Sequence, residues 1–204
     1  LGEGVQEFTY TPVVSSSRPQ NYAIVGYPLG MMKANVRQTN DAGEFLIDDD
    51  GFYIETTEPE LVGDPNPEWT AGRTNSISWN GLSLDFTWQY RHGGDMFSQD
   101  AATLVGRGVL NPGTVREGLY VLDGVNKNTG QTNTTQITAI NYGFDIFSFG
   151  PGELQIFDAT TIRLSEVNLS YDFPRNLLER TPFGSLTATL TGINLFYDAV
   201  NVPD

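Results

Sequence analysis

The side chains that perform acid–base and nucleophilic chemistry are scarce in this chain. His92 is the only histidine, and the 204 residues include no cysteine. A Ser-His-Asp triad needs a histidine oriented by a carboxylate, and zinc sites need several Cys or His ligands. A single histidine in the sequence Arg-His-Gly-Gly-Asp is more typical of the end of a strand and the start of a loop. We therefore expect no catalytic residue and no metal ligand set.

Carboxylates are plentiful, with 25 Asp and Glu against 11 Lys and Arg. A glycosidase needs two carboxyl groups at a defined separation, and nothing in the sequence brings Asp85 and Glu166 together. The run Asp48, Asp49 and Asp50 lacks the alternate spacing and the distal Glu of an EF-hand loop. We predict an acidic turn there and no cofactor, while a divalent cation bound by surface loops stays open as an alternative.

The overall composition excludes some partners and favours strands. Binding to nucleic-acid phosphates needs clustered Lys and Arg, whereas the basic residues here are scattered and the net charge is −14. We expect no nucleic-acid partner. The chain is rich in Thr, Asn, Ser, Gly and aromatic residues, which favours strands and loops over helices. No apolar run of about 18 residues is present, so no transmembrane helix is predicted.

The clearest element is the stretch 82–90, in which large apolar residues alternate with small or polar ones. Successive side chains of a strand point to opposite faces, so this strand has two unlike faces. The pattern is typical of a transmembrane β-barrel strand of about nine to eleven residues, and also of a half-buried strand in a soluble sandwich. On the barrel interpretation the lipid-facing residues are Leu82, Leu84, Phe86, Trp88 and Tyr90, and the lumen-facing residues are Ser83, Asp85, Thr87 and Gln89.

The residues around this strand predict its partners. Asn80-Gly81 is the strongest short hairpin signal, because a type I′ turn needs positive φ at both central positions, so residues 69–79 should pair with 82–90. A second two-faced strand lies within 155–173, where Val167, Leu169 and Tyr171 share a face that we predict to face lipid. A further strand over 185–196 should follow a short helical turn that begins after a proline.

Strict alternation fails in the N-terminal part of the second strand. Ile162 and Leu164 fall on its polar face by residue count. This change of phase indicates either a β-bulge or a portion above the membrane where both faces are wet.

Residues 92–154 read as a long loop with several glycines, a polar run and a possible short helix near 133–142. Long loops on one side and tight turns on the other are typical of outer-membrane barrels. The loop contains Phe97 and Tyr120, the two aromatic residues that we predict to contact a substrate. Trp79, Trp88 and Tyr90 are instead interpreted as an interfacial aromatic belt. We accordingly divide the chain into irregular strands and loops over 1–68 and C-terminal barrel strands over 69–204.

Several motifs resemble those of the SusC/RagA-type TonB-dependent outer-membrane transporters, in the same order and spacing. Residues 25–30 (VGYPLG) resemble the family's VGYPxG element, and residues 61–69 (LVGDPNPEW) its GNPNPxW element, with Asp64 in place of the more usual Asn. Residues 91–95 (RHGGD) resemble the end of the strand after the hairpin. Residues 158–171 (DATTIRLSEVNLSY) resemble the family's DASFIRLREVSLSY strand, and 194–196 (NLF) its GRNLF strand end, with Ile193 where Arg is commoner.

This resemblance implies an all-β fold, with antiparallel strands from the C-terminal part of a 22-stranded transmembrane barrel that has long extracellular loops. It implies import of glycans or peptides across the cell outer membrane rather than enzymatic activity. The implied partners are a SusD-like surface lipoprotein, outer-membrane lipid, and the TonB-ExbB-ExbD system, which would act through the plug region. No plug, TonB box or final strand is recognisable, so we expect a fragment of a longer protein. The rival interpretations are a secreted carbohydrate-binding β-sandwich and a structural outer-membrane component that does not transport.

Overall fold

A computed structural model describes residues 4–9, 18–109 and 117–199 of the chain. The chain divides into two compact units, each formed from segments that are separate in sequence. The first unit comprises Leu1–Asn66, Gly94–Asp158 and Asn201–Asp204, and the second comprises Pro67–Gly93 and Ala159–Val200. The described residues are mostly strand with few helices, in agreement with the predicted all-β class. None of the described helices is long and apolar enough to cross a membrane.

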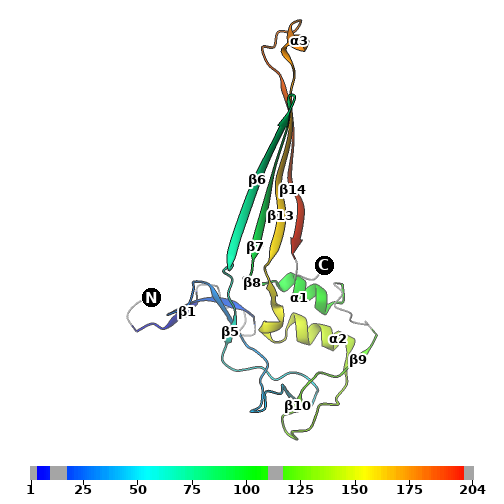
Figure 1. The fold of residues 1–204 in the computed structure, drawn as a ribbon. Coiled ribbons are helices and arrows are strands. Elements are labelled where there is room, and N and C mark those ends of the chain that lie inside the picture. The colour runs from blue at the N-terminus through cyan, green and yellow to red at the C-terminus, as the bar shows by residue number, and fades with distance from the viewer. Residues whose placement is uncertain (1–3, 10–17, 110–116, 200–204) are drawn as a thin grey trace. The chain divides into compact units, whose positions relative to one another are not determined.

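The second unit is a four-stranded antiparallel sheet with the strand order β14-β13-β7-β6. The four strands run side by side over most of their length (Figure 1). Their bounds are Trp69–Trp79 for β6, Leu82–His92 for β7, Thr161–Asp172 for β13 and Thr187–Ala199 for β14. A short helix, α3 (Arg175–Leu178), follows Pro174 in the connection from β13 to β14, as the sequence predicts.

The β6–β7 hairpin has the predicted two-residue turn. Asn80 and Gly81 have φ angles of 46° and 84°, so both central positions lie in the left-handed region that a type I′ turn requires. The turn also approaches the neighbouring strand, because the Asp172 N–H donates to the Gly81 carbonyl oxygen over 2.8 Å. A Cβ atom at position 81 would lie 2.9 Å from the Asp172 carbonyl oxygen. Glycine is therefore required both by its φ angle and by this contact.

A β-bulge in β13 explains the change of phase seen in the sequence. The register shifts between Leu164 and Glu166, so that Ser165 is the extra residue. The Ser165 hydroxyl donates to the Thr87 carbonyl oxygen of β7 over 3.0 Å. Beyond the bulge, Leu164 lies opposite Trp88 and Ile162 opposite Tyr90. The assignment of Ile162 and Leu164 to the polar face is therefore wrong, and the bulge alternative is confirmed.

The first unit contains shorter strands. A four-stranded antiparallel sheet has the order β1-β2-β3-β5, and three two-stranded sheets pair β10 with β4, β11 with β9, and β12 with β8. The first sheet is made of β1 (Glu7–Thr9), β2 (Gln20–Ile24), β3 (Met31–Ala34) and β5 (Glu60–Gly63). The others are β4 (Leu46–Ile47), β8 (Asp95–Phe97), β9 (Leu119–Tyr120), β10 (Val125–Asn126), β11 (Ile137–Thr138) and β12 (Ile156–Asp158).

Residues 92–154 are more helical than the sequence indicates. They contain α1 (Gln99–Gly106), α2 (Ala139–Asn141), a π-helix η1 (Tyr142–Ser148) and a 3₁₀-helix η2 (Gly152–Gln155). The helix expected near 133–142 thus begins later and continues as η1, and α1 was not predicted. Helices α1 and η1 cross where both lack a side chain, because a Cβ at Gly143 would lie 2.1 Å from the Gly106 carbonyl oxygen.

The core of the first unit is a cluster of Ile47, Leu122, Ile137 and Ile146, which are at most 4% exposed. Aromatic side chains that are partly buried pack around it, among them Phe52, Tyr53, Tyr120, Tyr142 and Phe147. Burying several large aliphatic side chains contributes about 1.5–3 kcal/mol each. The unit therefore has an apolar interior of its own.

Candidate functional site

One face of the second unit is lined by side-chain hydrogen bonds that join β6 to β7. The Ser78 and Ser83 hydroxyls lie 3.1 Å apart, and the Thr74 and Thr87 hydroxyls 3.0 Å apart. The Ser76 hydroxyl donates to the Asp85 carboxylate, and the Arg163 guanidinium of β13 donates to the Gln89 side-chain oxygen. The structure thus places the predicted lumen-facing residues Ser83, Asp85, Thr87 and Gln89 on one polar face, each with a partner on a neighbouring strand. That this face lines a lumen stays a prediction.

The polar face continues across β13 and β14. The Thr191 hydroxyl donates to the Asn168 side-chain oxygen over 2.7 Å, and the Thr187 hydroxyl to the Asp172 carboxylate over 2.5 Å. Asn168 also donates to Glu166 over 2.7 Å. Neighbouring hydroxyl, amide and carboxylate groups satisfy one another and leave further donors and acceptors for water. Such a surface suits a wet environment.

The structure brings Asp85 and Glu166 to the same polar face, which the sequence alone does not indicate. Asp85 lies opposite Asn168 and Glu166 lies opposite Thr87, so the two carboxylates are diagonal neighbours. Each already accepts a hydrogen bond, Asp85 from Ser76 and Glu166 from Asn168. Both carboxylates therefore belong to the polar network of the sheet.

The opposite face of the same sheet is apolar, and its side chains are exposed or half-buried. Leu82 lies opposite Tyr171, Leu84 opposite Leu169, and Phe86 opposite Val167. Leu169 is 40% exposed and Leu190, in the next strand, is 72% exposed. The predicted lipid-facing residues Leu82, Leu84, Phe86, Trp88, Tyr90, Val167, Leu169 and Tyr171 share this face. Contact with lipid stays a prediction.

Aromatic residues mark both ends of the apolar face. Trp79, Tyr171 and Phe173 lie at the end with the Asn80-Gly81 turn, and the Tyr171 and Phe173 rings are 5.0 Å apart. At the other end, Trp69 lies 5.0 Å from the Tyr90 ring, and Trp88 lies 6.0 Å from the Phe196 ring. From Trp69 to Trp79, β6 spans 11 residues. At about 3.3 Å per residue and a tilt of about 40°, this length corresponds to about 25 Å, the height of the apolar band of an outer-membrane barrel.

Two polar residues interrupt the apolar face on β6. Arg73 lies opposite Trp88, and Asn75 lies opposite Phe86. Neither residue was predicted as a site residue, although the predicted register of the hairpin is sufficient to place both on this face. A charged side chain on the lipid face of a barrel costs about 2–4 kcal/mol at the bilayer midplane and about 0–1 kcal/mol near the interfaces. If this face lies in a membrane, the energetic cost of Arg73 therefore depends on its depth in the bilayer.

His92 lies at the end of β7, as its sequence context predicts. Its ring stacks on Tyr90 and lies 5.3 Å from the Trp69 ring. Its Nε2 atom is 3.6 Å from a Glu68 carboxylate oxygen, and the Glu68 N–H donates to the His92 carbonyl oxygen. This arrangement fastens the two strand ends together.

The two predicted substrate contacts, Phe97 and Tyr120, lie in the first unit. Phe97 is half-buried and lies opposite Ile156 in the β8–β12 ladder. Tyr120 stacks on Tyr142 with a centroid distance of 4.4 Å and packs against the Ile47 cluster. Burial raises the pKa of Tyr142 above its ordinary value of 10.0. A role for Phe97 and Tyr120 in substrate binding stays a prediction.

The acidic run over residues 48–50 forms a turn held by its own carboxylates. The Asp48 Oδ1 atom accepts from the N–H groups of Asp50 and Phe52 over 3.0 and 2.8 Å. The Asp49 carboxylate accepts from the side-chain amides of Asn126 and Asn128, each over 2.9 Å, and these bonds lower the pKa of Asp49. Within the described ranges, no group of three His, Cys, Asp or Glu residues could hold a metal ion. The loop-bound cation stays a prediction.

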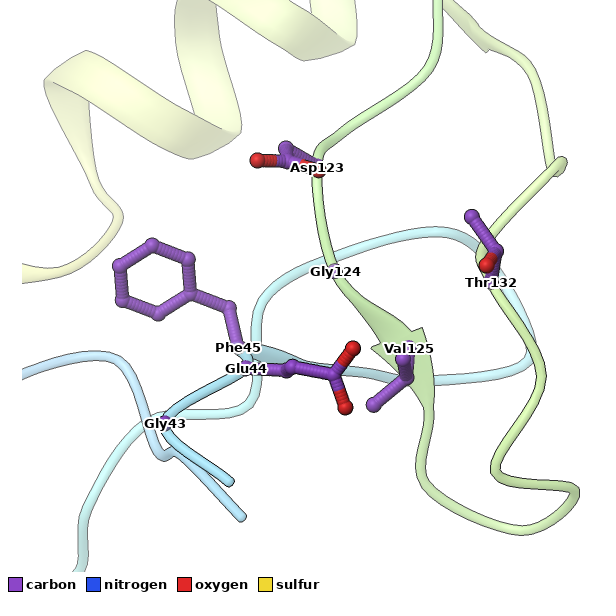
Figure 2. A pocket seen from close by; sticks show the side chains of 7 residues that line it. All are labelled: Gly43, Glu44, Phe45, Asp123, Gly124, Val125 and Thr132. Carbon is purple, nitrogen blue, oxygen red and sulfur yellow. The ribbon is translucent and has the colours of Figure 1, made fainter. Parts of the chain in front are cut away.

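A pocket of about 360 Å³ in the first unit is lined by Gly43, Glu44, Phe45, Asp123, Gly124, Val125 and Thr132. Figure 2 shows the Glu44 carboxylate extending towards Val125, whereas the Asp123 side chain points away from it. The two carboxylates are not directed at a common point. The pocket can offer hydrogen-bond acceptors to a polar ligand, but it has no paired acid and base for bond cleavage.

No model of a known protein family matches the chain. The TonB-dependent receptor P3 of Formosa agariphila is 22% identical to it over 162 residues, which cover 77% of this chain and 14% of that receptor. The RagAB peptide importer in its open-open state matches with a TM-score of 0.56 and 17% identity, over 97% of this chain and 21% of that one. The closed-closed state gives a TM-score of 0.53, again at 17% identity, over 96% of this chain and 21% of that one.

The chain has the fold of part of the RagAB peptide importer. This likeness agrees with the resemblance to SusC/RagA-type transporters found in the sequence. The chain spans about a fifth of the length of the RagAB structures and less of the receptor.

Proposed function

We propose that the chain forms wall strands and outer loops of a TonB-dependent importer that takes up glycans or peptides. The two-faced sheet of the second unit carries this proposal. A hydrogen-bonded polar face and an exposed apolar face, with aromatic residues at both ends of the apolar one, are the arrangement expected of a strand wall between water and lipid. On this proposal Ser83, Asp85, Thr87 and Gln89 face the lumen.

The comparisons support a peptide as the cargo, and a glycan is the other class that the sequence resemblance implies. The structural neighbours are two states of the RagAB peptide importer. By analogy, a SusD-like lipoprotein would cover the outer loops, here the first unit. The plug of the barrel would couple the wall to the TonB-ExbB-ExbD system, and the barrel would close with 22 strands.

The alternative, a secreted carbohydrate-binding sandwich, predicts a different environment for the apolar face. In a sandwich, that face packs on a second sheet about 10 Å away. The exposure of Ile77, Leu169 and Leu190, at 57%, 40% and 72%, favours the barrel wall.

Site-specific quenching by lipid separates the two functions. The chain contains no cysteine, so single cysteines can be introduced by Leu84→Cys and by Ser83→Cys, adjacent residues on opposite faces of β7. Each variant of the full-length protein is labelled with a fluorophore and reconstituted in vesicles that contain brominated phosphatidylcholine. We expect strong quenching at position 84 and little at position 83. Equal quenching at both positions, or none at either, would refute the proposed wall.

A further inference from the structure

We propose that Arg73 of β6 binds the phosphate of an anionic lipid head group in the outer leaflet. This inference rests on the proposed function, because it requires the apolar face of the sheet to lie in a bilayer. Arg73 is the one charged residue of β6, and its side chain is exposed. It lies on the apolar face, opposite Trp88.

In the part of the chain that the structure describes, no carboxylate forms an ion pair with Arg73. Among the residues that the structure describes, no hydrogen bond or ion pair reaches its guanidinium. Arg163 makes a useful contrast, because it lies at a similar height on the polar face and donates to Gln89. A charge without a partner on a lipid-facing surface is costly. Arg73 therefore needs either an oppositely charged or hydrogen-bonding group within the membrane, or access to the membrane surface.

The position of Arg73 along β6 gives it that access. It lies four residues from Trp69 and six from Trp79, the aromatic residues at the two ends of the strand. With the rise and tilt used above, these separations correspond to about 10 Å and about 15 Å of depth. The tight Asn80-Gly81 turn lies at the Trp79 end, and short turns of outer-membrane barrels face the periplasm. Arg73 is therefore nearer to the outer leaflet.

The neighbouring residues leave a path towards that surface. The next residue of β6 on the same face is Ala71, which lies opposite Tyr90 and occupies little space. A long basic side chain can lay its aliphatic stem along apolar surface and place its charged end at the interface. The guanidinium of Arg73 can thus pass over Ala71 to the level of Trp69 and Tyr90.

The chemistry at this level selects an anionic lipid. A guanidinium presents a planar fork of N–H donors that matches two phosphate oxygens. On the same face, His92 adds a further donor-bearing ring beside Trp69, and its carboxylate partner is Glu68. The acidic residue on the far strand of this face, Asp198, lies opposite Ile162, with β7 and β13 between its strand and β6. The Glu68 carboxylate is thus already engaged by His92, which leaves the Arg73 guanidinium to take a phosphate.

Lipid binding by two matched variants tests the inference. Arg73→Gln and Arg163→Gln remove the same charge at neighbouring heights on opposite faces. Each full-length variant is delipidated and titrated with detergent-solubilised phosphatidylglycerol and, separately, with phosphatidylcholine, and bound lipid is counted by native mass spectrometry. We expect wild type and Arg163→Gln to prefer phosphatidylglycerol by about fivefold, the factor for one basic residue near a membrane surface, and Arg73→Gln to lose this preference. Arg73→Lys should keep part of it.

Three outcomes would overturn the inference. Arg73→Gln could keep the full preference, Arg163→Gln could lose as much as Arg73→Gln, or Arg73→Gln could lose a co-purifying protein while its lipid binding is unchanged. The last result would assign this face to a protein partner. The quenching experiment at position 84 separates this failure from failure of the proposed function. Strong quenching there together with an unchanged Arg73→Gln variant rejects only the lipid contact, whereas no quenching rejects the wall itself.

Discussion

The two units of the molecule place their apolar residues in opposite ways. Eleven of the thirteen hydrophobic residues buried in the described chain belong to the first unit, and only Ala159 and Leu178 belong to the second. The second unit nevertheless contains the longest strands, and the large apolar side chains of these strands are exposed or half-buried. The first unit is therefore stabilised by an interior of its own. The sheet is stabilised by its hydrogen-bond ladders and by whatever medium covers its apolar face.

The units also differ in how polar side chains find partners. In the sheet the partners lie on neighbouring strands, as in the Thr74–Thr87 pair. In the first unit many polar side chains accept hydrogen bonds from backbone N–H groups that are close in sequence. Ser98 accepts from the Ala101 N–H at the start of α1, and Asn40 accepts from the Ala42 and Glu44 N–H groups in a turn. Polar groups thus join strands in one unit and shape loops in the other.

Removing core volume should have the largest effect, and its size should not depend on lipid. Ile47 is fully buried in the first unit. Ile47→Ala should lower the free energy of unfolding by about 2–5 kcal/mol, because it leaves a cavity. Urea unfolding of the full-length protein, followed by hydrogen exchange in β4, measures the loss in detergent and in vesicles. Ile140→Ala is the control, since Ile140 is 74% exposed and its truncation should change stability by less than about 0.5 kcal/mol.

Adding a charge to the apolar face of the sheet should give the next largest effect, and this effect should depend on lipid. Leu84→Arg should cost about 2–4 kcal/mol in bilayers if Leu84 faces the hydrocarbon, whereas Thr87→Arg on the polar face should cost little. Urea titration of both variants in phosphatidylcholine vesicles measures the difference. Equal losses at the two positions, or a loss that is the same without lipid, would contradict the contrast between the units.

The sequence predicts the sheet better than the first unit for a physical reason. Alternation over residues 82–90 and the Asn80-Gly81 turn are local signals, and each is sufficient to place its residues on a face or in a turn. Even the bulge at Ser165 leaves a local trace as a change of phase. By contrast, α1 and η1 meet at Gly106 and Gly143, which are far apart in sequence. No local pattern reveals such a contact.

The same distinction applies to the candidate sites. The two faces of β7 follow from residue types, and their partners follow from the register. The surroundings of Tyr120 do not, because they depend on Tyr142 and on the Ile47 cluster. The position of Arg73 on the apolar face could be predicted from the sequence, because the predicted hairpin places it opposite Trp88. It was missed because only one strand of that hairpin was assigned to faces.

Replacing the turn glycine should have an intermediate effect confined to the sheet. Gly81→Ala should destabilise the hairpin by about 1–2 kcal/mol, because an L-residue with φ near 84° is strained, and its Cβ would also press on Asp172. Vesicle-based urea unfolding would detect the change. Gly72→Ala in β6 is the matched control, since the nearest atom to its Cβ would be the Trp88 carbonyl oxygen at 3.9 Å. A Gly81→Ala variant as stable as wild type would show that the turn does not constrain the strands.

Acidification should have the smallest effect, and it should be local to the first unit. The amides of Asn126 and Asn128 lower the pKa of Asp49 below its ordinary value of 3.8. The folded state therefore binds the Asp49 proton less readily than the unfolded state, so this contribution to stability is complete above about pH 4 and is lost as the pH falls through the lowered pKa.

Asp49→Ala should remove that dependence, whereas Asp50→Ala should keep it, because the Asp50 side chain makes neither of these bonds. The Gly130 amide donates to the Asn126 carbonyl oxygen in the loop that contacts Asp49. Its hydrogen-exchange rate, corrected for the intrinsic rate at each pH, measures the stability of that loop. An identical acid response in Asp49→Ala and wild type would mean that the two asparagines hold the turn without the charge. The loops of the first unit would then be stabilised, like its core, by packing and local hydrogen bonds alone.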